Sequence, residues 1–347
     1  MKYVYGPVPS KRLGQSLGID TIPLKTCNWN CVYCQLGRTV PLTNKRREYY
    51  PRQEILEEIS EALRSHKTGD IDWITFVGSG EPTLHASIGW LIRQVKEEIS
   101  NIPVAVITNG SLLYLPKVRQ ELLAADAVLP SLDAGTAKLY RQINRPHGKI
   151  SFKRHVEGLA SFKNEFEGKL WIEVMLVRGL NDTEEALRDI AAALQRIKPD
   201  EVHINSPTRP PVETWVQPAD ADGFTRANSI FGEHAKVVSS VEGIFQVEES
   251  ESIVGAIIEI IKRHPISEDD LLRTLDNYPP EKVSETLAAL QISGLVQVVE
   301  RNGIHFWSAA RSNFPTETQS QATSPEHLKR HSRSVQKDKN SHSRIIV

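Results

Sequence analysis

Short apolar runs alternate with longer amphipathic stretches between about residues 17 and 205. The short runs are rich in β-branched residues and predict strands, whereas the longer stretches repeat apolar residues at helical spacing. The predicted strands cover residues 17–22, 73–77, 104–108, 127–132, 170–177 and 201–205. The predicted helices cover residues 52–66, 86–99, 116–124, 151–166 and 183–197. This alternation predicts an α/β fold with parallel strands, in the form of a partial (β/α)6 TIM-like barrel.

Polar or glycine-rich residues follow every predicted strand. They are a cysteine-containing loop, residues 78–82, Asn109, Ser131 with Asp133, Asn181 and Asn205. In barrels of parallel strands, the loops after the carboxyl ends of the strands carry the chemistry. The pattern therefore predicts one functional site at that end of the barrel.

The pattern changes from about residue 252. Helices are predicted over residues 253–263, 267–275 and 281–293, and a hairpin over residues 295–307 with Asn302-Gly303 as its turn. Three helices and a hairpin predict a small winged helix-turn-helix domain. We therefore assign residues 1–235 to the barrel, 236–251 to a linker, 252–310 to the winged helix and 311–347 to a disordered basic tail without contacts to the fold. A helix over residues 224–233 and a strand within 236–249 are further expectations.

Charge is uneven along the chain of 347 residues, although the formal net charge is only −1. The first 52 residues carry nine Lys or Arg against two acidic residues, which slightly favours an anionic substrate but also suits a solvated surface. The third C-terminal helix carries Glu281 and Glu285 against Lys282, which argues against direct DNA binding because phosphate contacts need cations.

Cysteine usage and hydropathy bear on the cellular compartment. The amino-terminal residues show no signal-peptide pattern, and we find no run of about 20 apolar residues that would predict a membrane span. Clustered, odd-numbered cysteines argue for a reducing compartment. We therefore expect a cytoplasmic location and no membrane partner.

All three cysteines lie in one loop, as Cys27, Cys31 and Cys34 with the spacing C-x3-C-x2-C. Thiolates favour zinc or iron–sulfur centres, and structural zinc sites usually take four protein ligands. Three thiolates on a cluster of four irons leave one iron open for another ligand. The alternative is a zinc site with His85 or His203 as the fourth ligand, in a metal-dependent regulator that binds nucleic acid through its winged helix.

Tyr33 stands directly before the third cysteine, and the whole motif resembles the signature of the radical S-adenosylmethionine (SAM) superfamily over residues 1–210. The resemblance implies a [4Fe–4S] cluster on the three cysteines, with SAM bound at the open iron. It further implies reductive cleavage of SAM to a 5′-deoxyadenosyl radical that abstracts a substrate hydrogen, and an electron donor such as flavodoxin or ferredoxin.

Gly78-Ser79-Gly80-Glu81 resembles the glycine-rich "GGE" motif of that superfamily, with serine at the second position. Glycines let a backbone approach a ligand closely. The resemblance implies that these four residues contact SAM and that Tyr33 packs near its adenine. Weaker candidates for cofactor contacts, each equally consistent with a structural hydrogen bond, are Asn109, Ser131, Asp133 and Asn205.

Residues 5–14, 16–20, 143–147 and 203–211 resemble an uncharacterised subgroup that is grouped with wyosine-type tRNA-modifying radical enzymes. Wyosine synthases carry a second cysteine-ligated cluster, and this chain has no further cysteine to bind one. The substrate therefore stays open among tRNA, a protein and a small molecule.

Overall fold

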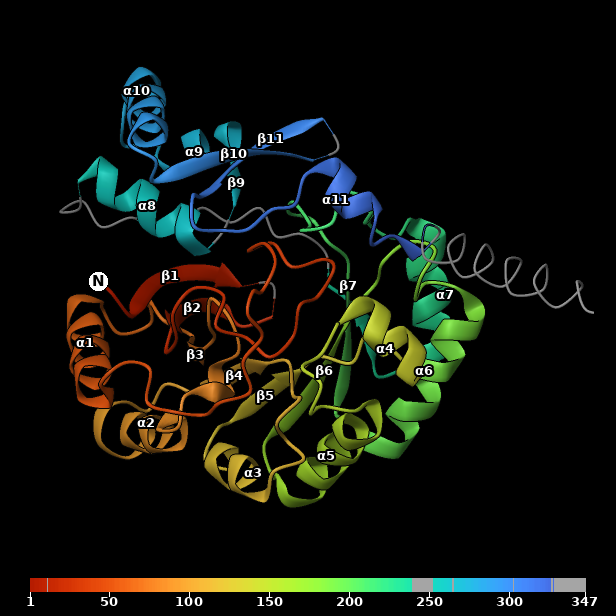
Figure 1. Cartoon of the computed structure of the whole chain (residues 1–347). Coiled ribbons are helices and arrows are strands. Elements are labelled where there is room, and N and C mark those ends of the chain that lie inside the picture. Colours follow the sequence, from red (N-terminus) through yellow and green to blue (C-terminus); the bar gives the residue numbers. More distant parts are fainter. Residues whose placement is uncertain (11, 239–251, 264, 302, 326, 328–347) are drawn as a thin grey trace, which may run out of the picture.

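The computed structural model describes residues 1–10, 12–238, 252–263, 265–301, 303–325 and 327. One large sheet, with strands in the order β1 to β8, carries helices on its outer side (Figure 1). Neighbouring strands from β2 to β8 pair in parallel, and β1 pairs antiparallel with β2. The strands are β1 (Val4–Ser10), β2 (Gly14–Ile19), β3 (Trp73–Phe76), β4 (Val104–Thr108), β5 (Ala127–Pro130), β6 (Lys169–Met175), β7 (Glu201–Asn205) and β8 (Ala235–Val237). The predicted parallel α/β architecture is confirmed.

Helices connect the strands and cover the outer face of the sheet. They are α1 (Arg52–Ser65), α2 (Ile88–Gln94), α3 (Pro116–Leu122), α4 (Ala137–Ile143), α5 (Phe152–Glu165), α6 (Glu184–Ile197) and α7 (Ala221–Phe231). A 3-10 helix, η1 (Pro82–Leu84), precedes α2, and a π-helical segment, η2 (Val95–Ile99), extends it. Helix α6 begins as its sequence indicates, because the Thr183 side chain accepts from the Ala186 N–H and Glu184 and Glu185 occupy the first turn.

In the barrel, strand β1 and helix α4 were not predicted, and strand β2 is displaced. Strand β1 contains Pro7 and Pro9, which argue against a strand, but it lies at the edge of the sheet, where proline is tolerated. Helix α4 is only seven residues long. Strand β2 covers Gly14–Ile19 rather than residues 17–22, and the side chain of Asp20, just after its end, accepts a hydrogen bond from Ser79.

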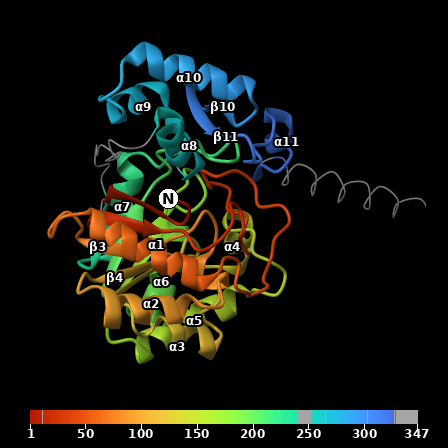
Figure 2. The ribbon, with the colours of Figure 1, turned by 90° about the vertical axis from the view of Figure 1, so that its left-hand side faces the viewer.

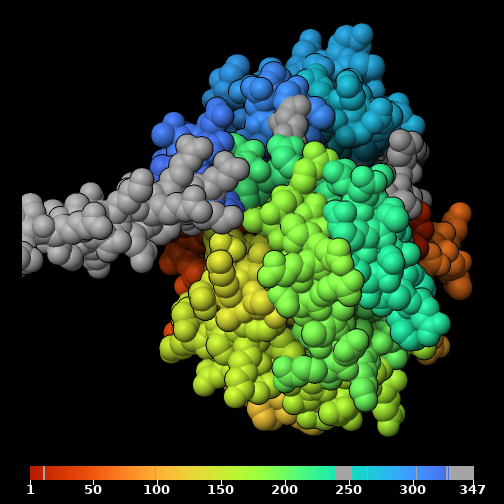
Figure 3. Space-filling view, turned by 90° about the vertical axis from the view of Figure 1, so that its right-hand side faces the viewer, coloured from red at the N-terminus to blue at the C-terminus, as the bar shows by residue number. Residues whose placement is uncertain are grey.

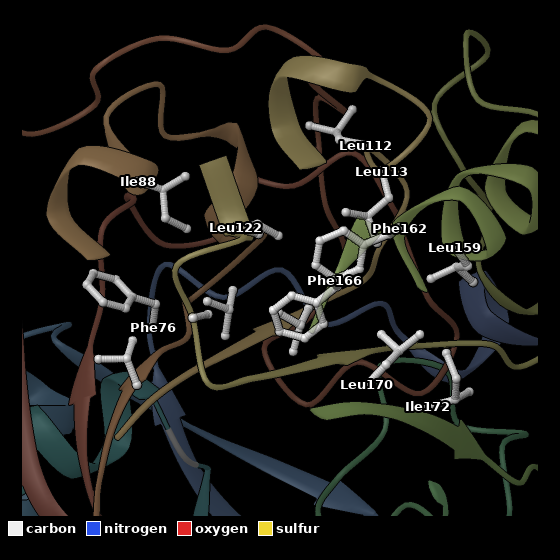
Figure 4. Packing of buried hydrophobic residues seen from close by; sticks show 14 of the residues in the cluster. Phe76, Ile88, Leu112, Leu113, Leu122, Leu159, Phe162, Phe166, Leu170 and Ile172 are labelled. Carbon is white, nitrogen blue, oxygen red and sulfur yellow. The ribbon is translucent and has the colours of Figure 1, made fainter. Parts of the chain in front are cut away.

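Packing between the sheet and the outer helices forms the main core. Figure 4 shows side chains from β3, β6, α2, α3 and α5 meeting there. Phe76, Leu122, Phe162 and Leu170 are fully buried, and the Phe162 and Phe166 rings stack with centroids 4.6 Å apart. This apolar layer holds the strands in register, and so holds the loops at their carboxyl ends together.

The C-terminal unit has its own core and its own sheet. Its elements are α8 (Ile253–Arg263), β9 (Ile266–Ser267), α9 (Glu268–Thr274), α10 (Pro280–Ile292), β10 (Val296–Arg301) and β11 (Ile304–Ala309). The strands form an antiparallel sheet in the order β10-β11-β9, and Ile257, Leu271 and Leu287 lie in the core beneath it. The predicted helices and hairpin strands are confirmed, although Asn302 of the turn lies outside the described residues. The two-residue strand β9 is too short for a sequence pattern to indicate.

Residues 311–325 correct the expectation of a tail without contacts. Helix α11 (Glu317–Gln321) begins with a capping box made by Thr316 and Gln319. Ser320 is fully buried, donates to the Glu213 carboxylate at 2.8 Å and accepts from the Thr214 N–H at 2.7 Å. Polar contacts hold this segment, so a count of apolar residues could not detect it. Residues 328–347, and 239–251 of the predicted linker, lie outside the described residues.

The C-terminal unit covers the end of the barrel that carries the cysteine loop. Figure 2 shows it as a layer above the barrel, and Figure 3 shows its residues, in blue, on top of the molecule. Arg301 donates to the carbonyl oxygens of Pro211 (3.0 Å) and Val212 (3.2 Å), in the segment after β7. The Gln35 side chain donates to the Arg263 carbonyl at 3.3 Å. In the part of the chain that the structure describes, no helix has the length and apolar character needed to cross a bilayer.

Candidate active site

The three cysteines line a single cavity of about 340 Å³ at the carboxyl ends of the strands. They lie in the loop after β2 and are each partly exposed. The Cys34 N–H donates to the Cys31 carbonyl at 3.1 Å, which turns the loop back on itself. The loop is anchored where the Val32 N–H donates to the Ile143 carbonyl at 2.9 Å. The structure therefore presents all three thiols to one cavity.

Nitrogen donors surround the sulfur atoms. The Lys25 ammonium lies 3.0 Å from Cys34 Sγ, and the Trp29 N–H lies 3.4 Å from Cys27 Sγ. The side-chain amide nitrogens of Asn109 and Asn144 lie 3.8 Å from Cys27 Sγ and 3.7 Å from Cys31 Sγ. Such donors stabilise thiolates and tune the potential of a bound metal centre.

Burial raises the pKa of the Cys27 thiol to about 12 and that of the Cys31 thiol well above its usual range. These thiols therefore need a nearby positive centre in order to ionise, and a bound metal supplies one.

An iron–sulfur cluster fits this arrangement. The described residues hold no group of three or more His, Cys, Asp or Glu side chains placed around one metal ion. Each thiolate of a [4Fe–4S] cluster binds a different iron, so its sulfur atoms stand around a cube rather than around one ion. Three thiols facing one cavity, with N–H donors to the sulfurs, meet that requirement.

The zinc alternative does not find its fourth ligand here. The described residues that line the cavity include no histidine. His85 Nε2 lies 3.0 Å from the Tyr50 carbonyl oxygen, and His203 Nε2 lies 2.9 Å from a Glu201 carboxylate oxygen.

The glycine-rich loop packs directly against the start of the cysteine loop. The Lys25 N–H donates to the Ser79 carbonyl at 2.6 Å, and the Glu81 N–H donates to the Thr26 carbonyl at 2.9 Å. A Cβ atom on Gly80 would stand 2.0 Å from the Thr26 carbonyl oxygen, so only glycine allows this approach. Gly78, Ser79 and Gly80, three of the residues for which cofactor contacts are predicted, line the cavity.

Serine at the second motif position has a structural reason. Its hydroxyl donates to Asp20 Oδ2 at 2.6 Å, and its N–H donates to Asp20 Oδ1 at 3.2 Å. Asp20 was not identified from the sequence, because it lay inside a predicted strand. It fixes the loop from behind while the loop backbone faces the cavity.

Glu81 has a different role from the predicted one. Its side chain is 1% exposed and accepts from the Thr83 N–H (2.9 Å), the Thr108 hydroxyl (2.6 Å) and the Asn109 N–H (2.7 Å). It therefore joins the glycine loop to the end of β4 and does not face the cavity. Glu81 is a positioning residue.

Tyr33 and Asp133 form a second positioning contact. Tyr33 lines the cavity, and its hydroxyl donates to Asp133 Oδ2 at 2.5 Å. Asp133 is 1% exposed and also accepts from the Asn144 amide (2.6 Å) and the Met175 N–H (2.8 Å). Burial raises the pKa of Asp133 to about 6, and the donors oppose that shift. Asp133 thus holds Tyr33 instead of lining the cavity.

Two weaker candidates are not among the described residues that line the cavity. Asn109 donates to the Asn28 side chain at 2.7 Å, next to Cys27. The Ser131 carbonyl lies 3.0 Å from His155 Nε2. The Ser131 contact joins the end of β5 to α5, whereas Asn109 also places its amide nitrogen 3.8 Å from Cys27 Sγ.

Comparison with known proteins identifies the family. Residues 21–191 match the model of the Radical SAM superfamily. A UPF0026 protein of Methanocaldococcus jannaschii is 35% identical over 284 residues, which cover 80% of this chain and 87% of that protein. The chain belongs to the UPF0026 family. It is a radical SAM enzyme, and this membership implies SAM and a [4Fe–4S] cluster as its cofactors.

Two further similarities concern extent and fold. A Brachyspira hyodysenteriae protein described as "GTPase Obg" is 40% identical over 306 residues, and the match covers 87% of this chain but 44% of that relative. This UPF0026 chain thus spans less than half the length of that protein. A solved radical SAM methyltransferase from Sphaerobacter thermophilus shares the fold with a TM-score of 0.51 at 17% identity, over 64% of this chain and 66% of that one.

A second cavity of about 310 Å³ adjoins the cysteine cavity in this UPF0026 protein. The two share Gln35, Met175, Ser206, Thr208 and Arg209 in their linings. Asn205, predicted as a cofactor contact, lies in this second cavity beside Arg12 and Glu173. Glu173 and Met175 stand two residues apart on β6 and so share a face of the strand, and Arg12 was not singled out from the sequence.

Proposed function

We propose that this protein holds a [4Fe–4S] cluster on Cys27, Cys31 and Cys34 and binds SAM against the backbone of residues 78–80. The observation that carries the proposal is the single cavity lined by all three thiols and by Gly78, Ser79 and Gly80. When bound, the reduced cluster supplies the electron that cleaves SAM to methionine and a 5′-deoxyadenosyl radical, which abstracts a hydrogen atom from the substrate.

The chain's own residues supply position and shielding. Asp20, Glu81 and Asp133 hold the two loops from behind through buried hydrogen bonds. Trp29 and Leu36 add apolar surface to the cavity wall, and the C-terminal unit covers the barrel end above it. A mainly apolar cavity beneath this cover limits the access of water to a reactive intermediate.

Anaerobic purification tests the proposal. We expect a brown protein with about four irons per chain that forms 5′-deoxyadenosine from SAM after reduction. Flavodoxin or ferredoxin, reduced enzymatically, should replace a chemical reductant. A colourless protein with one zinc per chain would instead support the regulator alternative.

Cys31→Ala is the matching variant. We expect iron content and 5′-deoxyadenosine formation to fall together to background, because one of three thiolates is lost. Arg188→Gln, on the exposed face of α6, is the control and should retain both. Full activity of Cys31→Ala would contradict the assignment.

The C-terminal unit is proposed to be a winged-helix-like docking module. The element order, the separate core and the acidic residues of α10 support docking rather than DNA binding.

Whether the substrate is a tRNA base is tested by comparing modified nucleosides in tRNA from a deletion strain and its parent. An unchanged profile would exclude tRNA.

A further inference from the structure

We propose that a groove along the outer edge of β10 binds an extended peptide segment of a partner protein, which pairs with β10 as an added strand and carries basic side chains. The described residues that line the groove are Thr214, residues 297–301 of β10 and residues 314–317, which lead into α11. Its volume is about 530 Å³. The inference rests on the docking role proposed for the C-terminal unit, and it needs neither the cluster nor SAM.

The outer edge of β10 carries backbone groups that the sheet does not use. In the part of the chain that the structure describes, β10 stands at one end of the order β10-β11-β9 and pairs only with β11. The Ala310 N–H donates to the Leu295 carbonyl at 3.1 Å, and hydrogen-bonded pairs alternate with non-bonded pairs in an antiparallel ladder. Residues 297, 299 and 301 therefore direct their backbone groups to β11. Val298 and Glu300 direct theirs to the outer edge, where an added strand can bind them.

The groove has two walls, and the space between them suits one strand. One wall is the edge of β10, where the lining residues 297–301 span about 17 Å at about 3.4 Å per residue. Phe314, Pro315 and the start of α11 form the other wall, and Figures 1 and 2 show α11 beside this hairpin. The β10 strand of a second copy would bring its own β11 into the same space. A single extended peptide has no such neighbouring strand, so it fits better.

The charged side chains of the groove favour a basic peptide. Glu300 and Glu317 are exposed, and Arg301 is the one basic residue of the described lining. Arg301 donates to two carbonyl oxygens of the barrel and to the Glu300 carbonyl, so it is held at the base of the groove. His305 Nε2 lies 3.7 Å from the Glu300 carboxylate and is charged only when protonated. A lysine or arginine of the added strand can pair with either carboxylate.

Apolar contacts add to the backbone pairing. Val298 is 38% exposed at the edge of the sheet, and Phe314 and Pro315 contribute to the lining. The aliphatic stem of a lysine covers apolar surface while its ammonium group stays in water. The peptide that fits this groove is therefore extended, basic and partly apolar.

Fluorescence polarisation with the full-length protein tests the inference. The probe is a labelled six-residue peptide of alternating lysine and valine, since valine favours an extended backbone. One matched probe carries glutamate in place of lysine, and another carries methyl groups on its backbone nitrogens. We expect saturable binding of the basic peptide and about tenfold or more weaker binding of both matched probes, because they lose charge pairing and backbone donors respectively.

Two groove variants and one control complete the test. The double variant Glu300→Lys with Glu317→Lys should weaken binding of the basic peptide about tenfold or more. Val298→Pro removes an outward N–H and should weaken binding to a similar degree. Glu285→Lys, exposed on α10 and outside the described lining, is the control and should bind as the unmodified chain does. Hydrogen exchange of residues 296–301 should slow when the peptide binds.

Each other outcome overturns the inference. These outcomes are absence of binding, equal binding by the groove variants and the control, and equal binding of the methylated peptide. A dimer in sedimentation that Val298→Pro converts to a monomer would place a second copy in the groove instead. If Val298→Pro does not fold, the double variant decides alone.

The inference and the proposed cluster function fail separately. A protein that forms 5′-deoxyadenosine but does not bind the basic peptide would overturn only the groove. Peptide binding by an iron-free protein that leaves SAM intact after reconstitution would overturn only the cluster function.

Discussion

At the residue scale, close backbone approach decides whether the two predicted motifs can form one site. Gly80 lies against the Thr26 carbonyl, and the adjoining backbone hydrogen bonds join the glycine loop to the residue before Cys27. The resemblance indicated the motif, but the close approach to the Thr26 carbonyl is the reason why residue 80 is a glycine.

Gly80→Ala should therefore displace the start of the cysteine loop. We expect iron content to fall by more than half and the free energy of unfolding by about 1–3 kcal/mol, because backbone must move to admit the methyl group. Iron assays and urea unfolding measure the two effects. Gly148→Ala is the control, since a Cβ there meets nothing within 4 Å. Normal iron content in Gly80→Ala would show that the loops do not depend on this contact.

His155 makes the free energy of unfolding depend on pH in the acidic range. It is fully buried, and burial lowers its pKa to about 4. In the unfolded chain its pKa is about 6.5, so between pH 6.5 and 4 the unfolded state binds more protons and stability falls as the pH falls. The full effect is about 3 kcal/mol. In His155→Gln, urea unfolding at pH 7 and pH 5 should differ less than in the unmodified chain; an identical pH dependence would contradict this.

At the scale of elements, α11 shows how a polar segment becomes part of a fold. Glu213 is fully buried, and its carboxylate accepts from Arg38, Arg145, Ser320 and Thr323. The last two donors come from α11 and the residues just after it. A buried carboxylate needs this number of partners.

Truncation after residue 310 should therefore destabilise the barrel. We expect a loss of about 1–3 kcal/mol, because Glu213 loses two hydroxyl donors. A chain that ends at residue 327 is the matched control and should keep its stability in urea unfolding. Equal stability of the two truncated chains would show that α11 contributes nothing.

At the scale of the whole molecule, Arg263 joins the C-terminal unit to the cofactor loop. Its Nε lies 3.8 Å from Asp20 Oδ2, its guanidinium lies 4.5 Å from the centre of the Tyr5 ring, and its side chain is buried. Asp20 in turn holds Ser79. The C-terminal unit and the glycine-rich loop are thus coupled through the charged and polar side chains of Arg263, Asp20 and Ser79.

Arg263→Gln should weaken that coupling. It leaves the buried Asp20 carboxylate without its cationic neighbour, and we expect unfolding to become easier by about 2 kcal/mol. SAM affinity should fall several-fold, measured by calorimetry on the reconstituted enzyme. Arg273→Gln, exposed on α9, is the control. Unchanged SAM affinity in Arg263→Gln would show that the C-terminal unit does not act on the glycine-rich loop through Arg263.

The local sequence pattern alone was sufficient to predict much of the fold and the two main motifs of this protein. Periodicity placed six parallel strands and the C-terminal helices, and spacing placed the three cysteines and the glycine motif at one end of the barrel. These features depend on neighbours within a few residues. Only the tertiary structure decided that Glu81 and Asp133 support the site from behind, that Arg12 enters the barrel, and that α11 binds Glu213. Their partners lie far away in the chain, and burial and hydrogen bonding are settled only when distant segments meet.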